Sequence, residues 1–235
     1  KGDGNLWWSG AVTKAATDAF SNNKKDFILL WNNDIVPKSN YFRELSKIIQ
    51  TIDKNTIVGS KICDLDDPVK IWSMGGIFNP RNGEKYMLGL DKKTNFNENA
   101  IIEPDWLTGM GTLISREVTE KIGFWNYRDF PLYHGDSDFT YRAKKNGIKL
   151  LVYPQLVIYN DTENTGFMHG GRLSKLIKSF GAIRSKYNLK KEWKFYRLHA
   201  SSWKAYMQLF YKYFKYTAGF FKWKVLHLFG KKTNQ

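Results

Sequence analysis

The chain has 235 residues, of which 42% are hydrophobic and 25% are charged, a balance typical of a globular protein. No stretch approaches the roughly 20 uncharged apolar residues of a spanning helix, and residues 1–20 contain no signal-peptide core. The single cysteine, Cys63, cannot form an internal disulfide, which indicates a reducing compartment or indifference to redox conditions.

The formal net charge of +15 is unevenly distributed along the chain. Residues 193–235 contain nine Lys or Arg and no acidic residue, which leaves +6 for residues 1–192. A basic excess concentrated in one segment favours an anionic partner of that segment.

Hydrophobic periodicity and capping residues predict alternating strands and helices, which indicates an α/β layer fold. The five apolar residues Phe27–Trp31 predict a fully buried strand of the kind found in the middle of a parallel sheet. Residues 80–99 are polar and predict a loop. In chain order, the other predicted elements are helices over 10–20, 40–49, 115–122 and 136–147, and strands over 56–62, 71–78, 101–107, 149–153 and 156–159. Ser39 or Asn40 is expected to cap the second of these helices, and Ser115 and Gly123 are expected to begin and end the third. Gly75 and Gly76 predict a close backbone approach within the strand over 71–78.

No strand is predicted before the first helix, because residues 2–6 form a loop that leads into it. A parallel sheet with so little sequence before Phe27–Trp31 would leave the edge of a buried strand open. We therefore expect further residues upstream of this sequence.

Polar residues follow the Phe27–Trp31 strand directly. Asp34 comes at its carboxyl end, where open α/β sheets bind ligands, and Asn32 and Asn33 add neutral oxygen donors. Such donors suit a hard divalent cation that bridges phosphate oxygens. The alternative is an ordinary turn, because Asn, Asp and Pro are common turn residues.

Four segments, taken together and in this order, resemble the family 2 glycosyltransferases of GT-A fold. The resemblance is greatest to the rhamnosyltransferase-like members that build bacterial surface polysaccharide, and it extends over roughly residues 2–160. The family's first βαβ portion, which holds the nucleotide base, has no counterpart here, so the chain as given is expected to bind a donor poorly. The four segments are Gly4–Ala11 (GNLWWSGA), Leu29–Asp34 (LLWNND), Trp106–Glu117 (WLTGMGTLISRE) and Phe130–Phe139 (FPLYHGDSDF).

The resemblance implies a GT-A domain over residues 1–190, with a Rossmann-like mixed, mainly parallel sheet flanked by helices and an incomplete N-terminal part. It implies inverting transfer of a sugar from a nucleotide-diphosphate donor to a saccharide or lipid-linked saccharide acceptor, in cell-surface polysaccharide synthesis. Mg²⁺ or Mn²⁺ would be held by Asp34 and would act on the leaving diphosphate. The residues implied to contact the donor are Asn32, Asn33, Trp106, Thr108 and Gly109, although ordinary strand-end packing is the alternative for the last three.

Asp136 is implied as the general base that takes the proton of the acceptor hydroxyl. Its alternative role is to cap the helix that follows, and the two roles can coexist. Asp138 lies about 200° away around the helix, so both carboxylates cannot face one small site. We expect Asp138 either to pair with Arg142 or to contact the acceptor.

Two histidines belong to the resemblance. His169 lies near a Gly-Gly-x-x-Ser stretch, where some relatives place a histidine that approaches the metal or diphosphate; the alternative is a solvated loop residue. His134 precedes the implied base and is expected to line the acceptor cleft rather than to bind metal.

The tail over residues 191–235 is basic and rich in aromatic residues, and Ser201–Phe229 predicts a helix. A polar stripe along it consists of Lys204, Gln208, Lys212, Lys215, Gly219 and Lys222. Such a helix fits an in-plane anchor on an anionic membrane, which predicts a cytoplasmic protein bound peripherally to the inner face of the cell membrane. The alternative is that its wide apolar face packs on the catalytic domain or on a second subunit.

Two other classes of function compete with the glycosyltransferase. The high isoelectric point of 9.7 and the interleaved aromatics are compatible with a non-catalytic polyanion or nucleic-acid binder. That hypothesis leaves Asn32, Asn33, Asp34 and Asp136 without a role, and we expect no nucleic-acid partner. The third class is a degenerate glycosyltransferase-like binding protein.

Overall fold

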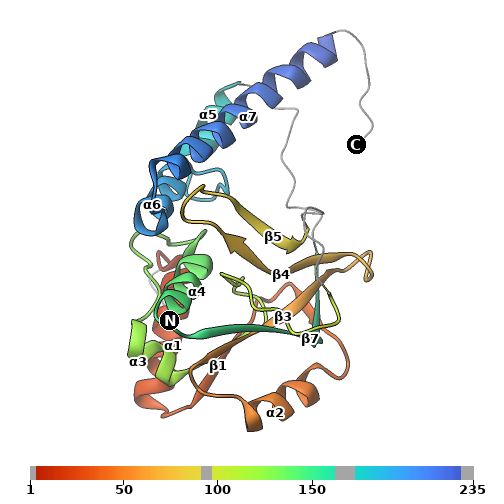
Figure 1. Ribbon diagram of the computed structural model, residues 1–235, viewed down its shortest axis with the longest axis vertical. Coiled ribbons are helices and arrows are strands. Elements are labelled where there is room, and N and C mark those ends of the chain that lie inside the picture. The colour runs from red at the N-terminus through yellow and green to blue at the C-terminus, as the bar shows by residue number, and fades with distance from the viewer. Residues whose placement is uncertain (1–3, 91–96, 162–172, 229–235) are drawn as a thin grey trace. The chain divides into compact units, whose positions relative to one another are not determined.

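The computed structural model describes residues 4–90, 97–161 and 173–228, which form two compact units (Figure 1). The first unit consists of Lys1–Phe78 and Lys85–Asn164, and the second of Asn79–Glu84 and Thr165–Gln235. This division differs from the predicted boundary at residue 190, because the helix that begins at Leu173 belongs to the second unit.

The first unit has the predicted α/β composition. Its helices are α1 (Trp7–Thr17), which continues into a π-helical turn (Asp18–Asn22), α2 (Tyr41–Thr51), α3 (Arg116–Ile122) and α4 (Gly135–Lys145). Its strands are β1 (Phe27–Leu30), β2 (Ile35–Pro37), β3 (Thr56–Asp64), β4 (Ile71–Phe78), β5 (Lys85–Gly89), β6 (Thr112–Ser115) and β7 (Lys149–Asn160).

These strands form one mixed sheet with the order β1-β6-β3-β4-β5, and β7 joins β3 to β2. The sheet is mixed as predicted, but it is not mainly parallel: β3 and β7 are its one parallel pair among the described residues. β6 runs antiparallel between β1 and β3, and β4 and β5 form a hairpin. Within the described residues, β1 pairs with β6 alone and in the antiparallel direction, so its other edge is open, as the sequence predicted.

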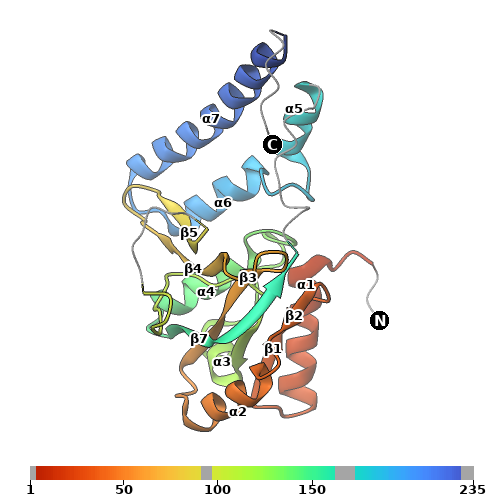
Figure 2. The same cartoon turned by 90° about the vertical axis from the view of Figure 1, so that its right-hand side faces the viewer.

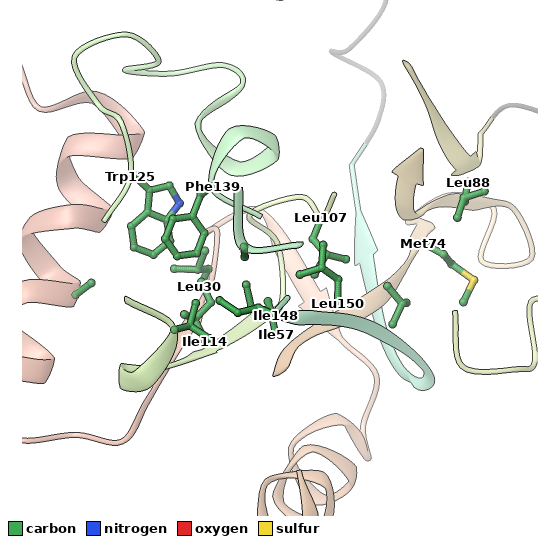
Figure 3. Close-up of a cluster of buried hydrophobic side chains, with 14 of the residues drawn as sticks. Leu30, Ile57, Met74, Leu88, Leu107, Ile114, Trp125, Phe139, Ile148 and Leu150 are labelled. Carbon is green, nitrogen blue, oxygen red and sulfur yellow. The ribbon is translucent and has the colours of Figure 1, made fainter. Parts of the chain in front are cut away.

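Helices cover both faces of the sheet. Side chains of α1, α3 and α4, among them Ala16, Val118 and Phe139, share one core cluster with strand residues (Figure 3). The helix α2 packs Tyr41 and Leu45 on the other face. Neighbouring strand residues divide between the two clusters, because side chains alternate across a sheet: Ile57 and Ile114 lie in the first, and Val58 and Leu113 in the second.

The long strand β7 changes faces along its length. Its register against β3 shifts at one point, where Tyr153 pairs with Ser60 and Val157 pairs with Lys61. Three extra residues enter β7 there, an odd number, so the even-numbered side chains move to the opposite face. Leu150 therefore packs with α1 and α4, whereas Ile158 packs with α2. The two predicted strands over 149–153 and 156–159 are one bulged strand.

Both predicted ends of α3 are confirmed. The Ser115 hydroxyl accepts a hydrogen bond from the Val118 amide at 3.2 Å and caps the helix, and Gly123 ends it at φ 74°. Asn40 holds the N-cap position of α2, but its side chain makes no capping hydrogen bond. Cys63 is a buried free thiol, and burial raises its pKa.

Two other predictions for the first unit are wrong. The predicted loop over 80–99 contains the strand β5, which the hairpin turn at Asn82-Gly83 introduces. The predicted strand over 101–107 contributes two isolated bridges, at Ile102 and Trp106. The strand next to β1 is instead β6, a few residues later.

The second unit consists of the helices α5 (Leu173–Gly181), α6 (Leu189–His199) and α7 (Trp203–Leu228) and of the turn over residues 79–84 (Figure 2). The predicted tail helix is confirmed as α7, and its Leu209 and Tyr213 are buried. The Tyr196 hydroxyl of α6 donates a hydrogen bond to the Gly83 carbonyl at 2.6 Å, which ties the turn to the helices. No helix in the described parts of the chain is long and apolar enough to cross a membrane.

A buried ion pair joins α6 to α7. Lys212 Nζ lies 2.8 Å from Glu192 Oε1, and the Glu192 side chain is 2% exposed. Burial alone would lower the pKa of the Lys212 ammonium, but the negative charge of Glu192 outweighs it, so the pKa is raised. Lys212 therefore does not belong to a solvent-facing polar stripe, and that part of the predicted tail pattern is wrong.

We expect Lys212→Met to lower the free energy of unfolding by about 3 kcal/mol, because it leaves the Glu192 carboxylate buried without its cation. Adding Glu192→Gln should restore most of the loss, since the buried charge is then removed as well. Thermal and urea unfolding of both variants would measure this. A double variant as unstable as the single one would mean that the pair is not what stabilises the α6–α7 contact.

Candidate active site

The loop over residues 105–111 contacts β4 near its start and β1 near its end. The Gly76 amide donates a hydrogen bond to the Trp106 carbonyl at 2.9 Å, and the Gly111 amide donates one to the Leu30 carbonyl at 2.9 Å. The Trp106 ring lies directly on Gly76, where a Cβ atom would collide with it. The predicted close backbone approach at Gly76 is therefore confirmed.

Alternate residues of this loop are held by one face of α4. Lys144 Nζ lies 2.8 Å from Asp105 Oδ1, and the Leu107 amide donates to Thr140 Oγ1 at 2.9 Å. The Gly109 amide donates to Asp136 Oδ2 at 3.1 Å. The three helix residues recur every four positions and so lie on one face. We call these three interactions the α4 contacts; they fix the loop relative to the first turn of the helix.

Asp136 lies in the first turn of α4 but is not its N-cap. The N-cap is His134, whose φ of 67° is left-handed. The prediction that Asp136 caps the helix is therefore wrong, because the helix begins one residue earlier, at Gly135. Its Oδ1 accepts from the Ser137 amide at 2.7 Å, and its Oδ2 accepts from Gly109. Each carboxylate oxygen has two lone-pair positions, so one on each remains available. The half-buried carboxylate can accept a further hydrogen bond from a bound hydroxyl.

The Gly-rich N-terminal segment packs against both of these segments. A Cβ atom at Gly109 would collide with the Trp8 ring, and one at Gly135 would collide with the Ser9 hydroxyl. The Ser9 amide donates to the Pro131 carbonyl at 2.9 Å. The Ser9 hydroxyl is fully buried and has no hydrogen-bond partner among the residues that the structure describes. Segments more than 90 residues apart in the sequence therefore meet at Asp136.

A lysine that the sequence did not single out lies against the first turn of α4. Lys85 Nζ is 3.2 Å from His134 Nδ1 and 3.0 Å from Ser137 Oγ, and it lies 5.0 Å from the centroid of the Trp106 ring. Lys85 is the first residue of β5, the strand that was predicted as loop. The Asn82-Gly83 turn signal could have placed it opposite β4.

Asp138 is fully buried, so its side chain has no surface that a bound acceptor could contact. Arg142 Nε lies 3.1 Å from its Oδ2, while the other guanidinium nitrogens donate to the carbonyls of Ile122 and Phe124 at 2.8 and 2.9 Å. The predicted ion pair is thus confirmed, and the predicted acceptor contact is wrong. The pair fixes α4 to the end of α3. The stacked rings of Trp125 and Phe139 pack beside it, with their centroids 4.1 Å apart.

The predicted donor residues of the loop are largely enclosed. Trp106 is 7% exposed and donates to the Ile77 carbonyl at 3.4 Å, and Thr108 is 8% exposed, with its carbonyl accepting from Thr112 Oγ1 at 2.7 Å. Packing within the first unit accounts for the burial of both residues. Gly109 differs, because its amide points at Asp136.

Asp34 lies in the turn between β1 and β2, with an exposed side chain, next to the exposed Asn33 and the half-buried Asn32. His169 lies outside the described residues. Within those residues, no three His, Cys, Asp or Glu side chains gather as a metal site. One carboxylate and two amide oxygens still fit a hard divalent cation whose other ligands are phosphate and water. Both the turn and the ligand interpretation of Asp34 therefore stand.

No protein-family profile matches the chain, and no curated protein matches it in sequence. Among solved structures, the crystal structure of GalNAc-T7 with UDP, GalNAc and Mn²⁺ is similar to it, with a TM-score of 0.48 and 14% sequence identity. The match covers 86% of this chain and 43% of that chain, so this sequence spans less than half of that protein's length. The similarity concerns the arrangement of strands and helices, and no residue role follows from it.

We expect Gly109→Ala to lower the free energy of unfolding by about 1–3 kcal/mol, because the new methyl group meets the Trp8 ring in a packed interior. Gly219→Ala is the matched control: a Cβ there, on α7, meets no described atom within 4 Å and should be neutral or stabilising. Thermal unfolding of the two variants would be compared. Equal stability of Gly109→Ala and the parent protein would mean that the loop does not lie against Trp8.

Proposed function

We propose that the protein is an inverting glycosyltransferase in which Asp136 is the general base. One observation supports this most: three of the four segments that resemble the family meet around the Asp136 carboxylate, and the fourth, Leu29–Asp34, runs alongside the same loop. The proposal assigns a chemical role to a carboxylate that has an open lone-pair position on each oxygen.

In the proposed reaction, the acceptor hydroxyl oxygen attacks the anomeric carbon of the donor sugar. The bond from that carbon to the diphosphate oxygen breaks as the new bond forms on the opposite face, so the configuration inverts and no covalent nucleophile is needed. The hydroxyl proton passes to Asp136, which must lie within hydrogen-bond distance of that oxygen. The diphosphate leaves as the anion.

The hydrogen bonds of Asp136 orient it for this role. Gly109 and Ser137 each hold one carboxylate oxygen, so the group has one preferred orientation before substrate binds. Lys85 is the cation next to His134 and Ser137, and it is the first residue of β5. We assign Lys85 and His134 to the wall of the acceptor pocket, where the pair offers hydrogen-bond donors to sugar hydroxyls.

The proposal includes a divalent cation at Asp34, with Asn32 and Asn33 beside it. Bound Mg²⁺ or Mn²⁺ would neutralise charge on the leaving diphosphate. Asp34 would supply the one carboxylate ligand of the protein. His169 is the second candidate ligand from the sequence.

The finer identity of the substrates rests on the sequence resemblance alone. It supports a nucleotide-diphosphate sugar as donor, with a saccharide or lipid-linked saccharide of bacterial surface polysaccharide as acceptor. These assignments are part of the proposal, as is the membership of family 2.

We expect Asp136→Asn in the full-length protein to lower turnover by about 10²-fold or more while donor binding is kept, because an amide keeps an acceptor oxygen for Gly109 but cannot take a proton. Single-turnover transfer and donor titration would measure the two effects. The matched control is Thr140→Val, which removes another of the α4 contacts and should lower stability with a much smaller effect on turnover. Unchanged turnover in Asp136→Asn, with lower stability only, would leave Asp136 with a structural role.

We expect Asp34→Ala to weaken Mn²⁺-dependent binding of a nucleoside diphosphate and to abolish transfer. Asp66 is exposed in the turn between β3 and β4, and Asp66→Ala offers a control that removes one acidic charge elsewhere in the unit. Isothermal titration with and without Mn²⁺ would separate the two variants. Transfer that continues at the same rate in EDTA would exclude the metal role.

A further inference from the structure

The helix α7 has three distinct faces. One face packs inside the second unit: Leu209, Tyr213 and Phe220 are buried, and the Tyr213 hydroxyl donates to the Tyr187 carbonyl at 2.9 Å. Lys212 borders this face through its ion pair with Glu192. Packing against α5 and α6 therefore accounts for one side of the helix only.

A second face carries large apolar side chains that are exposed. Trp203 is 70% exposed and Phe214 is 68% exposed. Neighbouring members of the set are separated by three, four or seven residues, so all lie on one side of the helix. We call this set the aromatic stripe; it consists of Trp203, Met207, Phe210, Phe214, Phe221 and Val225.

A third face carries lysines along the border of the aromatic stripe. Lys204, Lys215 and Lys222 lie about 100° around the helix from it, and Lys224 lies on the opposite border. All four are exposed. The one acidic residue between 165 and 235 is Glu192, which is buried and paired. An apolar face is thus bordered by cations without acidic side chains between them.

We propose that the aromatic stripe of α7 lies in the surface of an anionic lipid bilayer, with Lys204, Lys215, Lys222 and Lys224 against the lipid phosphates. Apolar side chains bordered by lysines suit the boundary between headgroups and acyl chains, where both kinds of group are satisfied. The packed face of the helix points away from the bilayer, so the helix lies in the plane. This inference stands independently of the proposed function.

Charge favours lipid over a second copy of the chain on the same stripe. Two copies would bring borders of equal, positive charge to one another, whereas anionic phosphates complement them. Most lysines of the predicted polar stripe lie on the third face of α7. The predicted packing alternative concerns the first, buried face. The structure separates these faces and removes Lys212 from the lipid-facing set.

Flotation of the full-length protein with vesicles tests the inference. Vesicles of phosphatidylcholine with phosphatidylglycerol should recover the protein, and phosphatidylcholine alone should recover much less of it. The double variant Phe210→Ser with Phe214→Ser should weaken binding roughly 100-fold, because two exposed rings no longer enter the apolar boundary. Added salt should weaken binding without abolishing it, since it screens charge but not apolar burial.

The charge contribution is tested by Lys204→Glu, Lys215→Glu and Lys222→Glu together, which should also weaken binding by roughly 100-fold or more. The matched control reverses three exposed lysines of the first unit, Lys121, Lys145 and Lys149, and should bind as the parent does. Lys212 is left unchanged, because a carboxylate there would face Glu192. Circular dichroism verifies that each variant is folded.

Two outcomes would overturn the inference. One is vesicle binding that persists when both phenylalanines or the three α7 lysines are changed in a folded protein. The other is absence of vesicle binding by the parent, combined with a dimer in sedimentation experiments that the Phe210→Ser, Phe214→Ser variant loses. The stripe would then be an interface between two copies.

Discussion

The arrangement of the first unit depends on the contacts between α4 and the loop over residues 105–111. Lys144, Thr140 and Asp136 each engage an alternate residue of that loop, so the helix and the loop are fixed as one element. Arg142, on another side of α4, holds the end of α3 and the buried Asp138. The helix is therefore immobilised from two sides. A carboxylate in its first turn gains a defined position, which a catalytic base requires.

The loop can approach α4 so closely because glycines stand where other segments touch it. At Gly109 the neighbour is the Trp8 ring, and at Gly76 it is the Trp106 ring. In the same way, Gly135 lies against Ser9 at the start of α1, where a Cβ atom would collide with the Ser9 hydroxyl. A side chain larger than that of glycine would not fit at any of these three positions. Together the contacts bring three distant parts of the chain to one place. Asp136 thus has both a structural and a proposed chemical role, and the two roles use different lone pairs of its oxygens.

Sequence patterns predicted the elements that carry local signals. The cap at Ser115, the terminating Gly123 and the i,i+4 pair of Asp138 and Arg142 depend on neighbours a few residues away, and all are observed. Strand direction and pairing depend on distant partners, so the antiparallel place of β6 beside β1 could not be read from either strand alone. Lys85 was missed for the same reason, since its proximity to His134 arises from a hairpin and a helix 49 residues apart. On α7 the lysine spacing was visible, but the buried partner of Lys212 was not.

In the proposed function, the acceptor hydroxyl binds at the Asp136 carboxylate and loses its proton there. A crystal structure of the full-length protein with a nucleoside diphosphate, Mn²⁺ and a saccharide acceptor would test this. We expect an acceptor hydroxyl about 2.6–3.2 Å from one Asp136 oxygen, with the Gly109 hydrogen bond intact. An acceptor bound elsewhere, with Asp136 contacting only the amides of Gly109 and Ser137, would contradict it.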